Sequence, residues 1–455
     1  MTFEKAPMRR IWLLIFFAAV AVRLLNLAIL PTDPAALLRE DASLYWTGAA
    51  VFIEHGSFSR EFGDTLVPHT ERVPGYMLFL AAIRAIFGNS LIAALVIQAL
   101  VDALTCVLTA WMAAQLSPKL ALPAGILAAL WPNLVVHSGT ILSDSLFLML
   151  FTAMLAAACR FLQAGAVRWT AAAGLALGLA TLTRPVSQLL PLLMAPAAFI
   201  VPIQHRRGLG AAVLATILFL ACTVAPLAPL LHRNYTQFGT LALTSQSGAH
   251  LIGWVVPLVR RAADGTPRAE GAAALSAKVN ALRTADGGHP DDLDPFARSR
   301  LYSQVGFEAL GRYPFSAIAT AWTTGAAINL AAPAVAIDGR VRALPHPSFD
   351  ETDGNGIVAR IFNFLSRASG LYLVIMGGGL LLSVAFLALQ GYGFVALARY
   401  APWPTLLAAL CIGYFLAVNG PVGSPKYRLP FEPVLIVLSA LALTDLVDRI
   451  RQRSQ

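Results

Sequence analysis

Charged residues are scarce in this sequence. Only 13% of its 455 residues are Asp, Glu, Lys or Arg, whereas soluble globular proteins carry about 25%. Hydrophobic residues make up 57% of the chain, and the mean hydropathy is +0.68. This composition excludes an ordinary water-soluble enzyme and predicts a chain that lies largely in a membrane.

Cysteine and metal-binding patterns are also lacking. The four cysteines lie in or beside apolar stretches that are far apart in the sequence, so they form neither a disulfide framework nor a metal-binding spacing. The histidines show no spacing of the HExxH type. We therefore expect no cofactor. A divalent metal ion is compatible with the sequence, although no ligand pattern predicts one. The chain also shows no internal repeat.

Apolar runs of about twenty residues, the length that crosses a bilayer, predict an all-α polytopic membrane protein with about ten transmembrane helices. Residues 74–88 are too short to cross and contain Arg84, so they are interpreted as a juxtamembrane helix. Residues 314–332 are interpreted as interfacial or re-entrant, because a crossing there would invert every later basic segment. The predicted spans are 11–30, 91–115, 121–138, 145–162, 169–184, 186–203, 209–231, 369–389, 402–419 and 432–447.

The net charge of +9 reflects how basic residues are distributed between the two sides of the membrane. Segments expected in the cytosol by the positive-inside rule hold an excess of Lys and Arg equal to the whole net charge, so we expect no nucleic-acid partner. Both termini are predicted to be cytosolic. The predicted parts are a seven-span module over 1–231 with an outer loop at 31–90, a non-cytosolic region over 232–366 with a helix at 296–310, and three spans within 367–455.

Two acidic residues, Glu40 and Asp41, lie just outside the first predicted span. Asp41 and Tyr45 are four residues apart and share one face if the stretch is helical. A carboxylate at the bilayer surface can take a proton from a hydroxyl that reacts with a lipid-linked group. The alternative interpretation is a pair of solvated loop charges or a helix N-cap.

Further ionisable residues lie at the predicted outer ends of later spans. Asp144 opens the fourth span, where a charge is costly and tends to be functional, although a helix N-cap would also explain it. Arg184 ends the fifth span, and Lys426 and Arg428 lie between the last two. The positive-inside rule disfavours cations on that side, so they indicate an anionic partner such as a phosphate. Binding of lipid headgroups, or snorkelling, is the alternative.

Three polar residues lie inside the predicted spans. Arg23 would be costly there without an acidic partner. Gln98 and Asp102 share a face of the second span, which favours hydrogen bonds between helices. We therefore expect these side chains to meet partners within the bundle.

Six segments, read in order, carry a family resemblance: REDASLYWTGA, ERVPGYMLFLAAIRAIFG, SDSLFLML, GLATLTRPVSQLLPLL, RNYTQFGTLALTSQSGAHLIG and KYRLPFEPVLIVLSAL. Together they resemble the GT-C superfamily of polyprenyl-phosphate-sugar-dependent glycosyltransferases. The nearest branch holds protein O-mannosyltransferases, the aminoarabinose lipid A transferase and rhizobial galacturonosyltransferases. Much of 255–365 and 370–420 lies outside the resemblance.

The resemblance implies an inverting transferase in the bacterial inner membrane with a periplasmic active site. Its donor would be an undecaprenyl or dolichyl monophosphate sugar, and its acceptor a hydroxyl of a lipid, glycan or protein. The general base would be Asp41 or Glu40, because the order Glu-Asp reverses that of many relatives. The resemblance implies donor-phosphate contacts at Arg72, Arg184, Lys426 and Arg428, and a substrate site that includes Asp144, Tyr45, Tyr427 and His137.

Two other functions are compatible with a membrane protein of this kind. One is a transporter or flippase for a lipid-linked glycan, and the other is a polymerase or ligase that uses a lipid pyrophosphate donor. Transporters favour internal repeats and ionisable residues near the midplane of the membrane. This chain places its acidic and basic candidates at one membrane face, which favours an enzyme.

Overall fold

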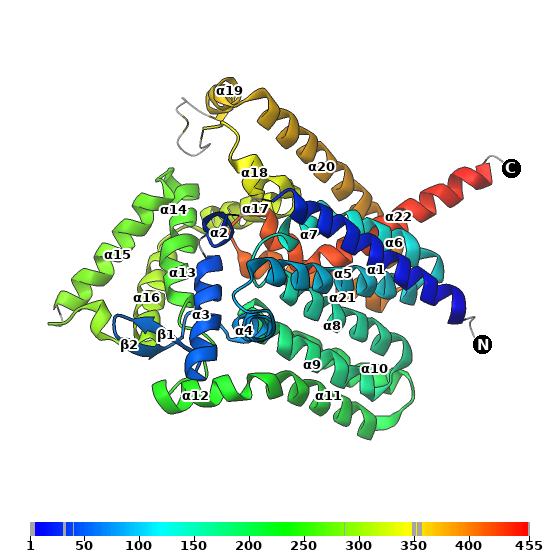
Figure 1. Ribbon diagram of the computed structural model, residues 1–455, viewed down its shortest axis with the longest axis horizontal. Helices are drawn as coiled ribbons and strands as arrows, with labels where there is room; N and C mark the ends of the chain where they lie inside the picture. Colours follow the sequence, from blue (N-terminus) through cyan, green and yellow to red (C-terminus); the bar gives the residue numbers. More distant parts are fainter. Residues whose placement is uncertain are drawn as a thin grey trace.

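The computed structural model describes residues 5–30, 33–39, 41–285, 287–347, 352 and 357–453. Within these ranges the strands are β1 (Ser59–Phe62) and β2 (Thr65–Pro68), which form an antiparallel hairpin with Ser59 opposite Pro68. All other regular structure described is helical (Figure 1). The predicted all-α fold class is confirmed, with this small hairpin as its one β element in the described part of the chain.

Among the described residues, seven helices are long and apolar enough to cross a membrane, and a helix pair bent by 50° would make an eighth span if it is counted as one. Two predicted spans are shorter helices, α9 (Val167–Thr183) and α10 (Leu190–Gln204). Each predicted span thus coincides with a helix or a bent pair, which confirms a polytopic membrane protein. The long helices and the pair are α1 (Lys5–Ala28), α5 (Leu91–Leu116), α6 (Ala121–Leu130) with α7 (Pro132–Ser138), α8 (Asp144–Ala164), α11 (Gly208–Val224) continuing into α12 (Ala228–Phe238), α20 (Gly370–Ala398), α21 (Pro402–Asn419) and α22 (Glu432–Arg453).

The other elements gather on the side of the bundle away from both chain ends, here called the loop end (Figure 1). The helices predicted over 74–88, 296–310 and 314–332 are α4, α16 and α17. The elements of the loop end are α2 (Pro34–Leu37), α3 (Asp41–His55), the hairpin, α4 (Gly75–Phe87), α13 (Ser247–His250), η4 (Leu251–Val255), α14 (Val256–Asp264), α15 (Arg268–Ala285), η5 (Pro290–Asp292), α16 (Pro295–Leu310), α17 (Phe315–Ala331), η6 (Ala334–Ile337), α18 (Gly339–Arg342) and α19 (Ile357–Arg367).

Short helical turns join several of the long helices. They are η1 (Pro118–Leu120), η2 (Pro185–Ser187), η3 (Ala225–Leu227) and η7 (Pro425–Phe431). Helix α8 packs between α5 and α9, α9 packs on α11, and α20 packs on α22. Phe151 on α8 stacks on Phe147 and meets the ring of Phe415 on α21 edge-on. These contacts fix the positions of the helix ends that carry the candidate site residues.

Arg23 holds the break between α6 and α7. Its Nε donates to Asp102 Oδ2 at 2.8 Å, and both side chains are at most 1% exposed. Its two terminal nitrogens donate to the carbonyl oxygens of Ala128 and Ala129, in the last turn of α6 before the bend. The expected acidic partner of Arg23 is therefore Asp102, and the pair joins α1, α5 and α6.

Replacing Asp102 by Ala leaves the Arg23 guanidinium buried without its counter-charge. We expect a loss of about 3–5 kcal/mol in the free energy of unfolding, measured as a lower midpoint of thermal unfolding in detergent. The double variant Arg23→Met with Asp102→Leu removes both charges and should recover most of the loss. Equal midpoints for the single and the double variant would contradict this account.

Candidate functional site

Asp41 is the first residue of helix α3, and its carboxylate is partly exposed to solvent. Its Oδ1 accepts a hydrogen bond from Arg72 Nη2 at 2.9 Å, and 47% of the Asp41 side chain stays exposed. Burial acts to lower the pKa of Arg72, but Asp41, together with Tyr45 and Glu71, raises that pKa above its ordinary value. Glu40, the other predicted acid, lies outside the described residues. Asp41 is thus accessible and held beside a permanent positive charge.

Close packing of α4 brings Arg72 to this position. Gly75 begins α4 so close to α9 that a Cβ atom there would lie 2.5 Å from the carbonyl oxygen of Leu182. The rings of Tyr45 and Tyr76 meet edge-on at 5.0 Å, and the Tyr76 hydroxyl donates to Gln98 Oε1 at 2.8 Å. Tyr45 therefore lies buried on the same helix as Asp41 and fixes α3 to α4.

A second cluster surrounds the buried carboxylate of Asp144, which is 1% exposed. Arg184, at the end of α9, forms an ion pair with its Oδ1. Lys426 Nζ, from η7, lies 3.4 Å from its Oδ2. Ser143, the residue before α8, makes no side-chain capping bond. Asp144 thus acts as the shared counter-ion of two cations that come from distant parts of the sequence.

The two clusters lie within electrostatic range of each other. Arg184 lies close enough to Asp41, Arg72, Tyr45 and Tyr427 for their charges and hydroxyl groups to act on it electrostatically. The structure therefore brings together residues predicted from the first loop, the fifth span and the loop before the last span.

Arg428 differs from the other predicted cations. Its side chain is 7% exposed. Its Nε donates to Glu432 Oε1 at 2.7 Å, and its Nη1 donates to Leu330 O at 2.5 Å. The structure thus ties Arg428 to α22 and to the end of α17, while Arg72, Arg184 and Lys426 surround the two aspartates.

Glu432 is a connecting residue that sequence reasoning missed. Its carboxylate, fully buried, accepts from Trp131 Nε1 at 2.6 Å and from Asn133 Nδ2 at 2.8 Å, in addition to Arg428. Asn133 also donates to Pro425 O at 2.9 Å, directly before Lys426. The available signal was a carboxylate at the start of the last predicted span, where a buried charge needs partners.

His137 lies buried beside this network. Its Nδ1 is 2.8 Å from the carbonyl oxygen of Asn133. A carbonyl only accepts, so Nδ1 carries the proton and Nε2 is left as an acceptor. The Nε2 atom is buried and has no hydrogen-bond partner among the described residues. The charges of Lys426, Arg184 and Arg428 act on the ring, so His137 lies within electrostatic range of these three cations.

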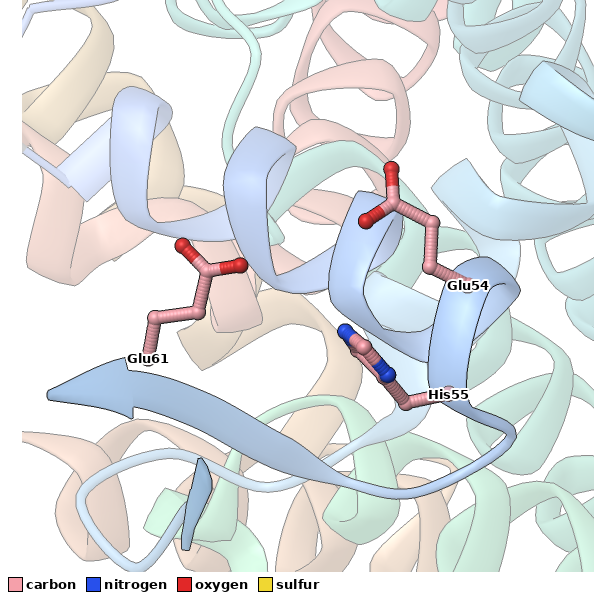
Figure 2. Close-up of side chains that lie close together, drawn as sticks. All are labelled: Glu54, His55 and Glu61. Atoms are coloured by element: carbon pink, nitrogen blue, oxygen red, sulfur yellow. The ribbon is translucent and has the colours of Figure 1, made fainter. Parts of the chain in front are cut away.

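Three side chains of types that bind metal ions lie together near the C-terminal end of α3. Side-chain atoms of Glu54, His55 and Glu61 lie within 4.8 Å of one another, and all three residues are exposed (Figure 2). The 15 residues of α3 place this group roughly 20 Å from Asp41, at about 1.5 Å per residue. It is therefore separate from the site around Asp41 and Asp144. Because exposed acidic groups are common without a metal ion, we assign this group no role.

The fold is that of an all-α polytopic membrane protein, and it is shared with solved glycosyltransferase structures. The archaeal oligosaccharyltransferase AglB from Archaeoglobus fulgidus, in complex with an inhibitory peptide and a dolichol-phosphate, matches with 15% identity and a TM-score of 0.54. The match covers 100% of this chain and 52% of that chain. The oligosaccharyltransferase of the same organism tethered with an acceptor peptide matches with 14% identity and a TM-score of 0.54, over 99% and 51% of the two chains. The protein thus spans about half the length of these archaeal chains.

The family match is local. Residues 69–230 match the model of the dolichyl-phosphate-mannose-protein mannosyltransferase family, and this segment carries Arg72, Asp144 and Arg184. ArnT from Cupriavidus metallidurans bound to undecaprenyl phosphate matches with 16% identity and a TM-score of 0.39, over 95% of this chain and 77% of that chain. No curated protein matches the sequence. The predicted resemblance to the GT-C superfamily is confirmed by the shared fold and by the family match.

His69 lies buried beside the Arg72 segment. It is 1% exposed, and its ring stacks on Phe58 at 5.1 Å. Neither ring nitrogen has a hydrogen-bond partner among the described residues. Burial, and then the charges of Arg60, Arg72 and Arg233, lowers the pKa of His69 to about 4. The folded protein therefore keeps this histidine neutral.

Replacing His69 by Phe should reduce the sensitivity of stability to acid. The unfolded chain binds a proton at His69 below about pH 6.5, while the folded chain binds it only near pH 4. The free energy of unfolding of the wild type therefore falls as the pH drops from about 6.5 to 4. His69→Phe should remove up to about 3 kcal/mol of this fall, measured by denaturant unfolding across that range. Identical pH slopes in both proteins would contradict the burial argument.

Proposed function

We propose that the protein is an integral membrane glycosyltransferase that uses a polyprenyl monophosphate sugar as donor. One observation carries the proposal: an accessible carboxylate, Asp41, lies beside cations gathered around a second, buried carboxylate, Asp144. In this proposal Asp41 is the general base, and the neighbouring cations bind the phosphate of the donor. The local match to a dolichyl-phosphate-mannose-dependent family supports the same chemistry.

In the proposed reaction Asp41 takes the proton of an acceptor hydroxyl. The hydroxyl oxygen forms a bond to the anomeric carbon while the bond from that carbon to the phosphate oxygen breaks, so the configuration inverts. Polyprenyl phosphate leaves with the bonding electrons. Arg72, Arg184 and Lys426 lie where they would stabilise the charge that develops on this phosphate.

Arg428 takes a different part in this proposal from the one that the resemblance implies. Two of its donor nitrogens already bind Glu432 and the carbonyl of Leu330. We therefore assign it the positioning of η7, which presents Lys426. His137 would offer its free Nε2 acceptor to a hydroxyl of the bound donor.

A cavity of about 110 Å³ supports a lipid-linked donor. Its lining includes Trp131, Leu330 and Arg428, and also Leu382 and Phe386 of α20. Its lining is mostly apolar, as an isoprenoid chain requires. The cavity lies next to the residues that hold η7, so a chain seated there would have its phosphate near Lys426.

The membrane and the substrates follow from the same proposal. We place the protein in a bacterial inner membrane with both termini in the cytosol and the loop end in the periplasm, where the acceptor would be a hydroxyl of a cell-envelope lipid or glycan. The start of α1 and the end of α22 lie on the same side of the bundle (Figure 1), which is consistent with this orientation. A hexose or a pentose fits the proposal equally.

Asp41→Asn should abolish sugar transfer, because an amide cannot accept the proton of the acceptor. Mass spectrometry of envelope glycolipids from a deletion strain that carries each variant measures the transfer, and immunoblotting of membranes measures protein level. Asp64→Asn, an exposed carboxylate in the same loop, is the matched control and should keep full transfer. Normal glycolipids with Asp41→Asn would refute the assignment of the base.

Lys426→Gln should weaken binding of the lipid phosphate. Loss of one charge-assisted contact of about 1.4 kcal/mol or more raises the dissociation constant by at least tenfold. Titration of the purified protein with undecaprenyl phosphate, followed by native mass spectrometry, measures this constant. Lys278→Gln, at a lysine that pairs with Glu308 on the loop side, should leave the constant unchanged. Equal weakening by both variants would indicate nonspecific attraction.

A further inference from the structure

Helix α19 leaves an apolar face without a partner. Its sequence IVARIFNFLSR contains two arginines and no acidic residue. The side chains of Ile361, Phe362 and Leu365 are 43%, 70% and 48% exposed. These positions lie on one side of a helix with 100° per residue. Large apolar side chains on one face of a cationic helix are typical of helices that lie on a membrane.

Contacts at its C-terminal end fix how α19 is turned. The ring of Phe364 meets Tyr372 of α20 edge-on at 6.2 Å, and His346 stacks on the same tyrosine at 4.2 Å. The backbone N–H of Ser369 donates to Pro345 O at 2.9 Å. One side of α19 is therefore anchored to the start of α20, and the face formed by Ile361, Phe362 and Leu365 turns away from these contacts.

The neighbouring helix identifies what lies next to that face. Helix α20 is long and apolar enough to span a membrane, and none of its best 18-residue window is buried inside the protein. Its surface therefore meets lipid along most of its length. Helix α19 lies at the loop-side end of α20 (Figure 1), where the apolar surface of a spanning helix reaches the lipid headgroups.

We propose that α19 is a membrane-surface helix that docks on the lipid at the loop end, with Ile361, Phe362 and Leu365 among the acyl chains. At the start of α20, Leu371 and Val374 are also exposed apolar side chains, and the cationic, acid-free sequence of α19 suits anionic headgroups. Docking would fix the loop-side end of α20, which lies far from the buried residues Gln390, Gly393 and Leu397 at the other end of the helix. The inference does not depend on the proposed transferase activity.

Nitroxide labels at two positions of α19 test the proposal in the full-length protein. Phe362→Cys reports on the apolar face, and Asn363→Cys, 100° around the helix, reports on the polar side. Both are made in a Cys222→Ala background, because the other three cysteines are buried. The labelled proteins are reconstituted in vesicles of phosphatidylcholine with phosphatidylglycerol, and collision rates with oxygen and with a water-soluble nickel complex are measured.

We expect oxygen collisions to exceed nickel collisions several-fold at position 362 and the ratio to reverse at position 363. Equal nickel accessibility at both positions would show that α19 lies in water and would overturn the proposal. Low accessibility of position 362 to both reagents would show that protein covers the face, as in contact with a second copy, and would overturn it as well.

Discussion

The buried carboxylate of Glu432 is the constraint on which the site depends. A charge without solvent is costly unless donors surround it, and Glu432 meets the donors of Trp131, Asn133 and Arg428. These three side chains come from the bend between α6 and α7 and from η7. One carboxylate thereby fixes the broken span, the last spanning helix and the loop that carries Lys426, so that Lys426 reaches Asp144.

The two aspartates of the site differ in exposure, and this difference separates their roles. Asp144 is buried and shared by Arg184 and Lys426, so it holds cations in place. Asp41 pairs with Arg72 but keeps nearly half of its side chain exposed, so an incoming hydroxyl can reach it. The arrangement leaves cations beside an accessible carboxylate, and the proposed transfer from a phosphate-linked donor depends on this combination.

Much of this arrangement can be predicted from the sequence. Hydropathy predicts the helices, and the positive-inside rule identifies cations on the non-cytosolic side as unusual. Arg184 and Lys426 were found by that criterion, and the helical face of Asp41 and Tyr45 by spacing. Trp131 and Asn133 were missed because single polar residues in an apolar run do not reveal their partners. The structural use of Arg428 was equally hidden, since it depends on a carboxylate four residues away and on carbonyls about a hundred residues earlier.

The most direct measurement of the central claim is a cryo-electron microscopy map of the protein in lipid nanodiscs with undecaprenyl phosphate. The account predicts density for the phosphate in contact with Lys426 and Arg184, near Asp41, and density for the isoprenoid chain along α20. Phosphate density at another place, with the ion pairs of Asp144 unchanged and the surface around Asp41 empty, would contradict it.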